Sequence, residues 1–216
     1  MREKKHGKYL NEQIKAVENP LPEMRETFEE EFNLLKKLCK NKKVLDVGCG
    51  TGRPADKLAK FCKRIVCIDN NKDILDVAKQ NLSKINNVKI LEEDAFYMSS
   101  KDNRFDVSYA TYNLIGSIGS KDKLIKEMLR VTKKGGEVII FTWKRDKITT
   151  SFLKKYYKSL GFDIKSIDED KTITNKWVFE RVDPNLIIDL FEKNGLEKIK
   201  IKDIGSVWCA IIGKKA

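Results

Sequence analysis

Histidine is nearly absent from this sequence, in which His6 is the only one among 216 residues. The five cysteines form no Cys-x-x-Cys pair, so the residues that usually build a zinc site or a Cys–His nucleophile are scarce. An odd number of cysteines, most of them with apolar neighbours, favours reduced thiols over a disulfide framework. We therefore expect no metal site and a cytoplasmic location.

Long apolar runs are missing as well. No stretch approaches the roughly 20 consecutive apolar residues that a membrane-spanning helix needs. The N-terminal region lacks the apolar core of a secretory signal peptide. We therefore expect neither a targeting segment nor a membrane partner.

Charge is plentiful and unbalanced, with a net charge of +12 at neutral pH. A lysine-rich solvated surface explains this excess, and so does an anionic partner such as RNA. No arginine-rich cluster or known nucleic-acid module supports the second interpretation. Both interpretations stay open at this stage.

The chain is organised around residues 44–52, which read VLDVGCGTG. An apolar run breaks into three alternate glycines, and a helix restarts at Pro54, as at the junction of a strand and a helix. Such glycines let the backbone turn sharply and leave room for a ligand against it. Asp46 would repel the pyrophosphate of a dinucleotide and attract a cationic amino-acid group. Arg53 also breaks the dinucleotide pattern G-x-G-x-x-G.

Apolar strands alternate with amphipathic helices through the first two thirds of the chain. The patterns predict strands over residues 44–47, 64–69, 88–91, 105–110 and 137–143. This alternation predicts an α/β protein with a doubly wound, mostly parallel sheet. Asp69 ends the second strand, so we expect it beside the glycine turn, where its carboxylate can accept two hydrogen bonds from a ribose diol.

Four segments are expected within a single domain spanning residues 1–216. They are N-terminal helices (1–41), a cofactor-binding core (42–143), a cap inserted after the fifth strand (144–183), and a C-terminal helix with a strand hairpin (184–216). The cap reads as a helix followed by a hairpin, with Ile173 to Phe179 alternating along one strand. A lid that selects the acceptor and an ordinary packing unit with a basic solvated face both fit this pattern.

Four segments together resemble the class I S-adenosylmethionine-dependent methyltransferases. They are the glycine run, Asp69 in CIDNN, the segment EEDAF and the strand in FDVSYATYN, in the same order and at similar spacings. The likeness covers residues 40–145 well and the C-terminal strands more loosely. It implies a seven-stranded Rossmann-like sheet with the last strand antiparallel, and S-adenosyl-L-methionine as the cofactor.

The resemblance also implies which residues hold the methionine part of the cofactor. Asp46 and the backbone at Gly48, Cys49 and Gly50 take this role. Cys49 is interpreted as a small residue of the turn rather than as a nucleophile.

The ribose and the adenine have their own implied contacts. Asp69 would hold the ribose hydroxyls and Asn70 would flank the adenine. Asp94 would accept a hydrogen bond from the adenine amino group, with Ala95 packing nearby. The competing interpretations are that Asp69 caps a helix and that Asp94 is an acid in a turn.

The acceptor is expected to meet the cofactor after the fourth strand. Tyr109 and Tyr112 are candidates to line the sulfonium, because a positive charge is attracted to an aromatic face. Packing at the sheet edge is the alternative for both tyrosines. Tyr112 and Asn113 are the candidate catalytic residues, Asn113 as a hydrogen-bond partner of the acceptor. The segment departs from the Asp/Asn-Pro-Pro-Tyr and Pro-Cys patterns, which disfavours adenine, glutamine and cytosine-C5 acceptors.

The sequence thus predicts methyl transfer by in-line displacement onto a small-molecule acceptor. No general base stands out, which suits an amine that arrives neutral better than a hydroxyl. The alternatives are a methyltransferase acting on tRNA or rRNA, and a non-catalytic subunit that binds the cofactor. The sequence makes no prediction of oligomeric state.

Overall fold

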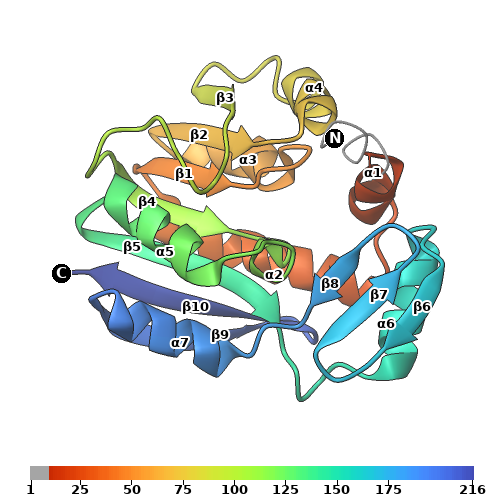
Figure 1. Cartoon of the computed structure of the whole chain (residues 1–216). Helices are drawn as coiled ribbons and strands as arrows, with labels where there is room; N and C mark the ends of the chain where they lie inside the picture. Colours follow the sequence, from red (N-terminus) through yellow and green to blue (C-terminus); the bar gives the residue numbers. More distant parts are fainter. Residues whose placement is uncertain (1–9) are drawn as a thin grey trace.

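A seven-stranded sheet forms the centre of the protein. The computed structural model describes residues 10–216, and Figure 1 shows the sheet with helices on both sides. The strand order is β3-β2-β1-β4-β5-β10-β9. Its strands are β1 (Lys43–Val47), β2 (Arg64–Asp69), β3 (Val88–Glu92), β4 (Phe105–Ala110), β5 (Thr132–Trp143), β9 (Leu196–Ile204) and β10 (Trp208–Lys215).

The first five strands are parallel, and β10 is antiparallel to both of its neighbours. This arrangement confirms the predicted Rossmann-like sheet with an antiparallel last strand. At the outer edge, β9 carries exposed Lys198, Lys200 and Lys202. Such charges discourage pairing of the edge strand with another chain.

Helices bury the two faces of the sheet in separate clusters. Neighbouring residues of β1 illustrate this division, because Val44 packs in one cluster and Leu45 in the other. One face is covered by α2 (Pro22–Cys39), α3 (Arg53–Leu58) and α4 (Lys72–Asn81). The other face is covered by α5 (Lys121–Val131) and α7 (Pro184–Lys193).

The start of the fifth strand differs from the sequence-based expectation, and the start of the first helix is not described. The fifth strand begins at Thr132 rather than at residue 137, so Gly135 and Gly136 lie inside β5. A Cβ on Gly136 would stand 2.8 Å from the carbonyl oxygen of Asp106, because β4 passes close to the strand there. The first helix, α1, is described from Leu10 to Glu18. The part of the expected N-terminal helix before Leu10, which includes His6, lies outside the described residues.

The cap after β5 contains the expected helix, α6 (Thr150–Ser159), but its hairpin has a third strand. The strands are β6 (Ile164–Ile167), β7 (Lys171–Thr174) and β8 (Val178–Glu180), all antiparallel. Residues 173–179 were expected as a single strand. A tight turn divides them, because the amide of Thr174 donates to the carbonyl of Trp177 at 2.8 Å and its hydroxyl accepts from the Trp177 amide at 2.9 Å.

Two further global features can be stated for residues 10–216. No helix in this range combines the length and the apolar character needed to cross a membrane. All five cysteines are buried and none forms a disulfide.

Candidate functional site

A cavity of about 620 Å³ lies at the carboxyl ends of the parallel strands. Its walls include residues that follow β1, β2, β3 and β4, and they are completed by α1 and the cap. In Figure 1 the cap and α1 lie together at the end of the sheet to which the arrow of β4 points. This volume is in the range of small-molecule sites.

The glycine turn after β1 forms one wall of the cavity. Gly48 and Gly50 both have left-handed φ angles, +67° and +54°. A Cβ on Gly48 would press on the side chain of Leu114 at 2.8 Å, whereas a Cβ on Gly50 would meet nothing within 4 Å. Gly48 is therefore required for packing, and the backbone at Gly50 faces open space. Cys49, between them, is buried and anchors the turn through its amide, which donates to the Ile68 carbonyl at 2.9 Å.

Asp69 joins this turn to the end of β2. One carboxylate oxygen accepts from the Gly50 amide and the other from the Asn71 amide, each at 3.0 Å. The N-cap of α4 is Asn71, whose side chain accepts from the Asp73 amide at 3.1 Å. Helix capping is thus assigned to Asn71, and Asp69 lines the cavity together with the exposed Asn70.

The loop after β3 brings Asp94 and Ala95 to the same cavity. Asp94 is exposed, and its Oδ1 accepts from the Phe96 amide at 2.8 Å. Asp94 therefore stabilises the turn that follows β3, which was the alternative interpretation of this residue. Its second oxygen, Oδ2, has no hydrogen bond to the part of the chain that the structure describes.

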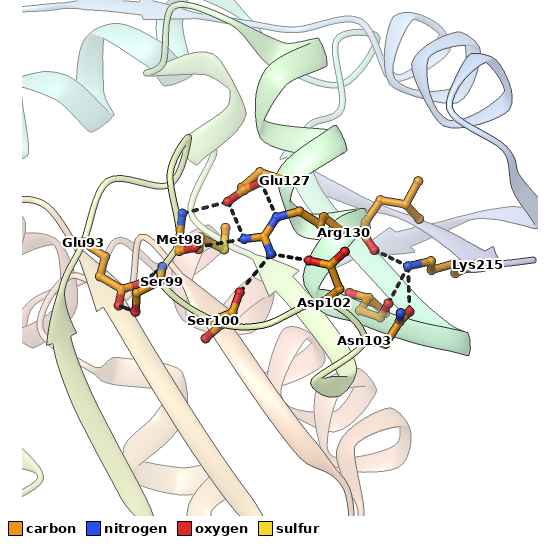
Figure 2. A network of polar contacts seen from close by, with 11 residues as sticks. Glu93, Met98, Ser99, Ser100, Asp102, Asn103, Glu127, Arg130 and Lys215 are labelled. Atoms are coloured by element: carbon orange, nitrogen blue, oxygen red, sulfur yellow. Dashed lines mark hydrogen bonds and ion pairs between the residues drawn. The ribbon is translucent and has the colours of Figure 1, made fainter.

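Figure 2 shows the polar contacts between this loop and Arg130 of α5. The guanidinium donates to the carbonyls of Met98 and Ser100, both at 2.9 Å. It also pairs with Asp102 at 2.6 Å and with Glu127 at 2.7 Å, while Glu127 accepts from the Met98 amide at 2.7 Å. Both backbone groups of Met98 are therefore bound by α5, which fixes the end of the loop that carries Asp94.

Two predicted cofactor residues do not reach the cavity. Asp46 and Tyr109 are partners in the register of β1 and β4, and both are fully buried beneath the turn. They point to the same face as Val44, because alternate side chains of a strand share a face. No hydrogen-bond partner lies at suitable geometry for the Asp46 carboxyl or the Tyr109 hydroxyl within residues 10–216. Burial raises the pKa of Asp46 to about 7 and the pKa of Tyr109 well above its usual value. The expected contact of Tyr109 with the sulfonium is not supported by this position.

The candidate catalytic residues lie on the cavity wall after β4, but in different situations. Tyr112 and Asn113 both adopt left-handed φ angles, +53° and +55°, which is uncommon for residues with a side chain. The Asn113 amide nitrogen donates to the Glu180 carbonyl at 2.9 Å, and its oxygen accepts from the Thr142 hydroxyl at 3.2 Å. Asn113 therefore connects the cap to β5. The nitrogen and the oxygen of its side-chain amide, which was predicted to bind the acceptor, both have hydrogen-bond partners within the protein.

Tyr112 instead presents its hydroxyl to the hydroxyl of Tyr156 on α6, with which it forms a hydrogen bond. The Tyr112 ring packs edge-on against Trp208, with 5.5 Å between ring centroids. Burial raises the pKa of Tyr112 to about 12 and that of Tyr156 well above its usual value. Both hydroxyls therefore remain protonated near neutral pH.

The sequence left open whether the cap is a lid, and it did not identify the cap residues that line the cavity. These are Tyr156 and Tyr157 of α6, together with Phe162, Trp177 and Phe179. The helical spacing of the apolar residues of α6 was visible in the sequence. It could not indicate that the apolar face of α6 meets the cavity as well as the core.

An ion pair beside the glycine turn was also missed. Glu31 of α2 is completely buried, and Arg53 Nη2 donates to both of its oxygens, at 2.8 and 3.0 Å. The guanidinium carbon of Arg53 lies 4.0 Å from the centroid of the Phe28 ring. Burial raises the pKa of Glu31, and the charge of Arg53 opposes that shift. Arg53 lines both the main cavity and a smaller one of about 380 Å³, and Glu31 lines the smaller one.

Comparisons with known proteins agree with this geometry. A family model described as a methyltransferase domain matches residues 44–136. The ubiquinone/menaquinone biosynthesis C-methyltransferase UbiE of Idiomarina loihiensis is 34% identical over 131 residues, which cover 56% of this chain and 50% of that protein. The demethylmenaquinone methyltransferase of Staphylococcus haemolyticus is 29% identical over 185 residues, covering 80% and 76%.

The chain spans about half the length of the first curated relatives it matches. Among solved structures, a SAM-dependent methyltransferase from Aquifex aeolicus superimposes with a TM-score of 0.71 at 19% identity, covering 96% of this chain and 98% of that one. This likeness concerns the fold. The sheet order, the glycine turn and the family model over residues 44–136 agree, and the chain has the fold of the class I S-adenosylmethionine-dependent methyltransferases.

Proposed function

We propose that this chain transfers the methyl group of S-adenosylmethionine to a small-molecule acceptor by in-line displacement. The observation that carries the proposal is the glycine at position 50, whose backbone faces open space next to the Asp69 carboxylate. The names of the relatives support the acceptor class, since one is a quinone-biosynthesis C-methyltransferase and another a sterol 4-C-methyltransferase from Caenorhabditis elegans.

The residues around the cavity fit this cofactor. We assign the ribose hydroxyls to Asp69, which lines the cavity at the end of β2 and whose two oxygens accept from the amides of Gly50 and Asn71. We assign the adenine to Asn70, Ala95 and the second oxygen of Asp94. These three residues line the cavity at neighbouring strand ends.

The methionine end of the cofactor is assigned to the turn itself. Its backbone at Gly48, Cys49 and Gly50 leaves room for a ligand at position 50. Beneath it lies the carboxyl of Asp46, buried and without a hydrogen-bond partner in the described part of the chain. When ionised, this carboxylate favours a cationic group over the turn through its field rather than through direct contact.

When bound, the cofactor supplies a methyl group on a positively charged sulfur, so the donor needs no further activation. Methyl transfer would leave the electron pair of the carbon–sulfur bond on sulfur, and an acceptor that carries a proton would lose it to solvent. The protein contributes orientation and exclusion of water. We assign these tasks to Tyr112 and to the cap, residues 144–183, as part of one domain.

The compartment that we propose is the cytosol. All five cysteines are buried thiols, which suits a reducing environment.

Tritiated S-adenosylmethionine added with the protein to a cell extract tests the proposal. Label in the small-molecule fraction is the expected result. Label in RNA would support the RNA-directed alternative instead. Calorimetry that records cofactor binding without label in any fraction would favour a non-catalytic binding role.

A further inference from the structure

The half of the cavity that the cap covers is lined by aromatic rings. They belong to Trp143, Tyr156, Tyr157, Phe162, Trp177 and Phe179. Several rings contact each other in stacked or edge-on geometry, including Tyr157 and Phe179 at 4.9 Å and Trp143 and Tyr156 at 5.5 Å between centroids. Aromatic walls of this kind favour a flat ring, which can join the same stacked and edge-on contacts.

Two charged side chains that line the cavity beside this half are paired with partners among residues 10–216. Glu12 of α1 is ion-paired with Lys176 of the cap. Arg53 is held by both oxygens of the buried Glu31. A third charge, the guanidinium of Arg181, does not line the cavity and donates to the Thr172 hydroxyl and to backbone carbonyls of the cap. A charged acceptor group placed among the rings would therefore lose its hydration without meeting an unpaired charge among the described residues that line this half, which is strongly unfavourable.

A positive acceptor is a special case, because ring faces attract cations. A protonated nitrogen, however, has no lone pair with which to accept a methyl group. The amine that reacts must arrive neutral, so the aromatic half would serve the uncharged form in any event.

The hydroxyls of Tyr112 and Tyr156 are polar groups within this aromatic surface, and they form a hydrogen bond with each other. Two hydroxyl groups carry two hydrogens, and only one of them can lie between the two oxygens. Neither hydroxyl has another hydrogen-bond partner within residues 10–216. The pair therefore keeps one donor available, and the raised pKa values of both tyrosines keep that donor protonated.

We propose that the aromatic half of the cavity binds an uncharged acceptor with a flat ring, and that the Tyr112–Tyr156 hydroxyl pair donates a hydrogen bond to an oxygen substituent on that ring. This inference rests on the proposed function, because the cofactor must fill the opposite half of the same cavity. It assigns Tyr156 as a substrate-binding residue and makes the cap the element that selects the acceptor.

Fluorine NMR with three matched probes tests the proposal on the full chain saturated with S-adenosylhomocysteine. The probes are 4-fluorophenol, fluorobenzene and 4-fluorobenzoate, which share a ring and differ in hydroxyl and charge. We expect 4-fluorophenol to bind at least about tenfold more tightly than 4-fluorobenzoate. Equal affinity for these two probes, or a preference for the benzoate, would overturn the proposal.

The double variant Tyr112→Phe/Tyr156→Phe removes both hydroxyls and keeps both rings, because either single variant would leave one hydroxyl with an available hydrogen. The double variant should weaken 4-fluorophenol about threefold to tenfold, the effect of one neutral hydrogen bond, and leave fluorobenzene unchanged. Tyr97→Phe is the matched control, because Tyr97 is 70% exposed and lies outside the cavity wall. Equal weakening of 4-fluorophenol and fluorobenzene, or no weakening of either, would contradict a hydrogen-bonding role.

The same samples separate this inference from the proposed function. Calorimetry with S-adenosylhomocysteine reports the cofactor half alone. If that ligand binds and the probes fail the tests above, the acceptor assignment is wrong while the methyltransferase proposal stands. If S-adenosylhomocysteine does not bind, the proposed function itself fails.

Discussion

Replacing Asp46 with asparagine should change how the stability of the free protein depends on pH. Asp46 is fully buried, and its carboxyl has no hydrogen-bond partner among the described residues. Burial raises its pKa to about 7, whereas an aspartate in an unfolded chain has a pKa of about 3.9. Between these two values the folded state keeps a proton that the unfolded state has released.

The sign and the size of the effect follow from this difference. Below about pH 4 the buried Asp46 does not lower the free energy of unfolding. As the pH rises from about 4 towards 7, the free energy of unfolding falls, because only the unfolded chain releases the proton. Above about pH 7 the loss stays constant. One pKa unit corresponds to about 1.4 kcal/mol, so the full penalty is about 4 kcal/mol. Between pH 5 and pH 8.5 the change is about 3 kcal/mol. Asparagine cannot ionise, so Asp46→Asn should lack this component.

Chemical denaturation at pH 5 and pH 8.5, without cofactor, measures the difference. The wild type should lose about 3 kcal/mol of unfolding free energy relative to Asp46→Asn over this interval. Asp189→Asn is the control, because it removes an exposed carboxyl from α7. Identical pH dependence in the wild type and Asp46→Asn would refute the reasoning that Asp46 is buried without a compensating partner.

Four other substitutions test the contacts around the cavity. Asp69→Ala should weaken S-adenosylmethionine binding by about 1–3 kcal/mol in calorimetry, because polar groups lose their partner; unchanged affinity in a folded variant would remove Asp69 from the site. Arg130→Met should speed amide exchange at Met98 and weaken cofactor binding, since the adenine-side loop loses its anchor; unaltered exchange would argue against that role. Arg53→Met should destabilise the protein by about 3–5 kcal/mol in denaturation, because it leaves Glu31 buried and unpaired, and Glu31→Gln should cost less.

Sequence patterns located the sheet edge well because the signals involved are local. An apolar run followed by glycines must turn where the strand ends, and an acid directly after a strand must lie at the same edge as its parallel neighbours. Gly50, Asp69 and Asp94 line the cavity for this reason. The expected helix after β2 is present, and its cap is Asn71 rather than Asp69, the cap considered from the sequence.

The same patterns could not decide which way a side chain faces or which partner it meets. Tyr109 and Tyr112 are three residues apart, but one is buried within β4 and the other lies on the cavity wall. A left-handed backbone at Tyr112 separates the two outcomes. Asn113 looked free to bind an acceptor until the carbonyl of Glu180, 67 residues later, was found at 2.9 Å.

The sequence by itself determined the order of strands and helices in the main sheet, the position of the glycine turn and the acids that follow β2 and β3. Each of these depends on residues that are close together in the chain. Only the tertiary structure decided that Arg53 pairs with Glu31, that the carboxyl of Asp46 is buried without a well-aligned hydrogen bond, and that Tyr156 meets Tyr112. Those relations depend on how α2 and the cap dock against the sheet, and docking is set by the packing of whole elements rather than by any local pattern.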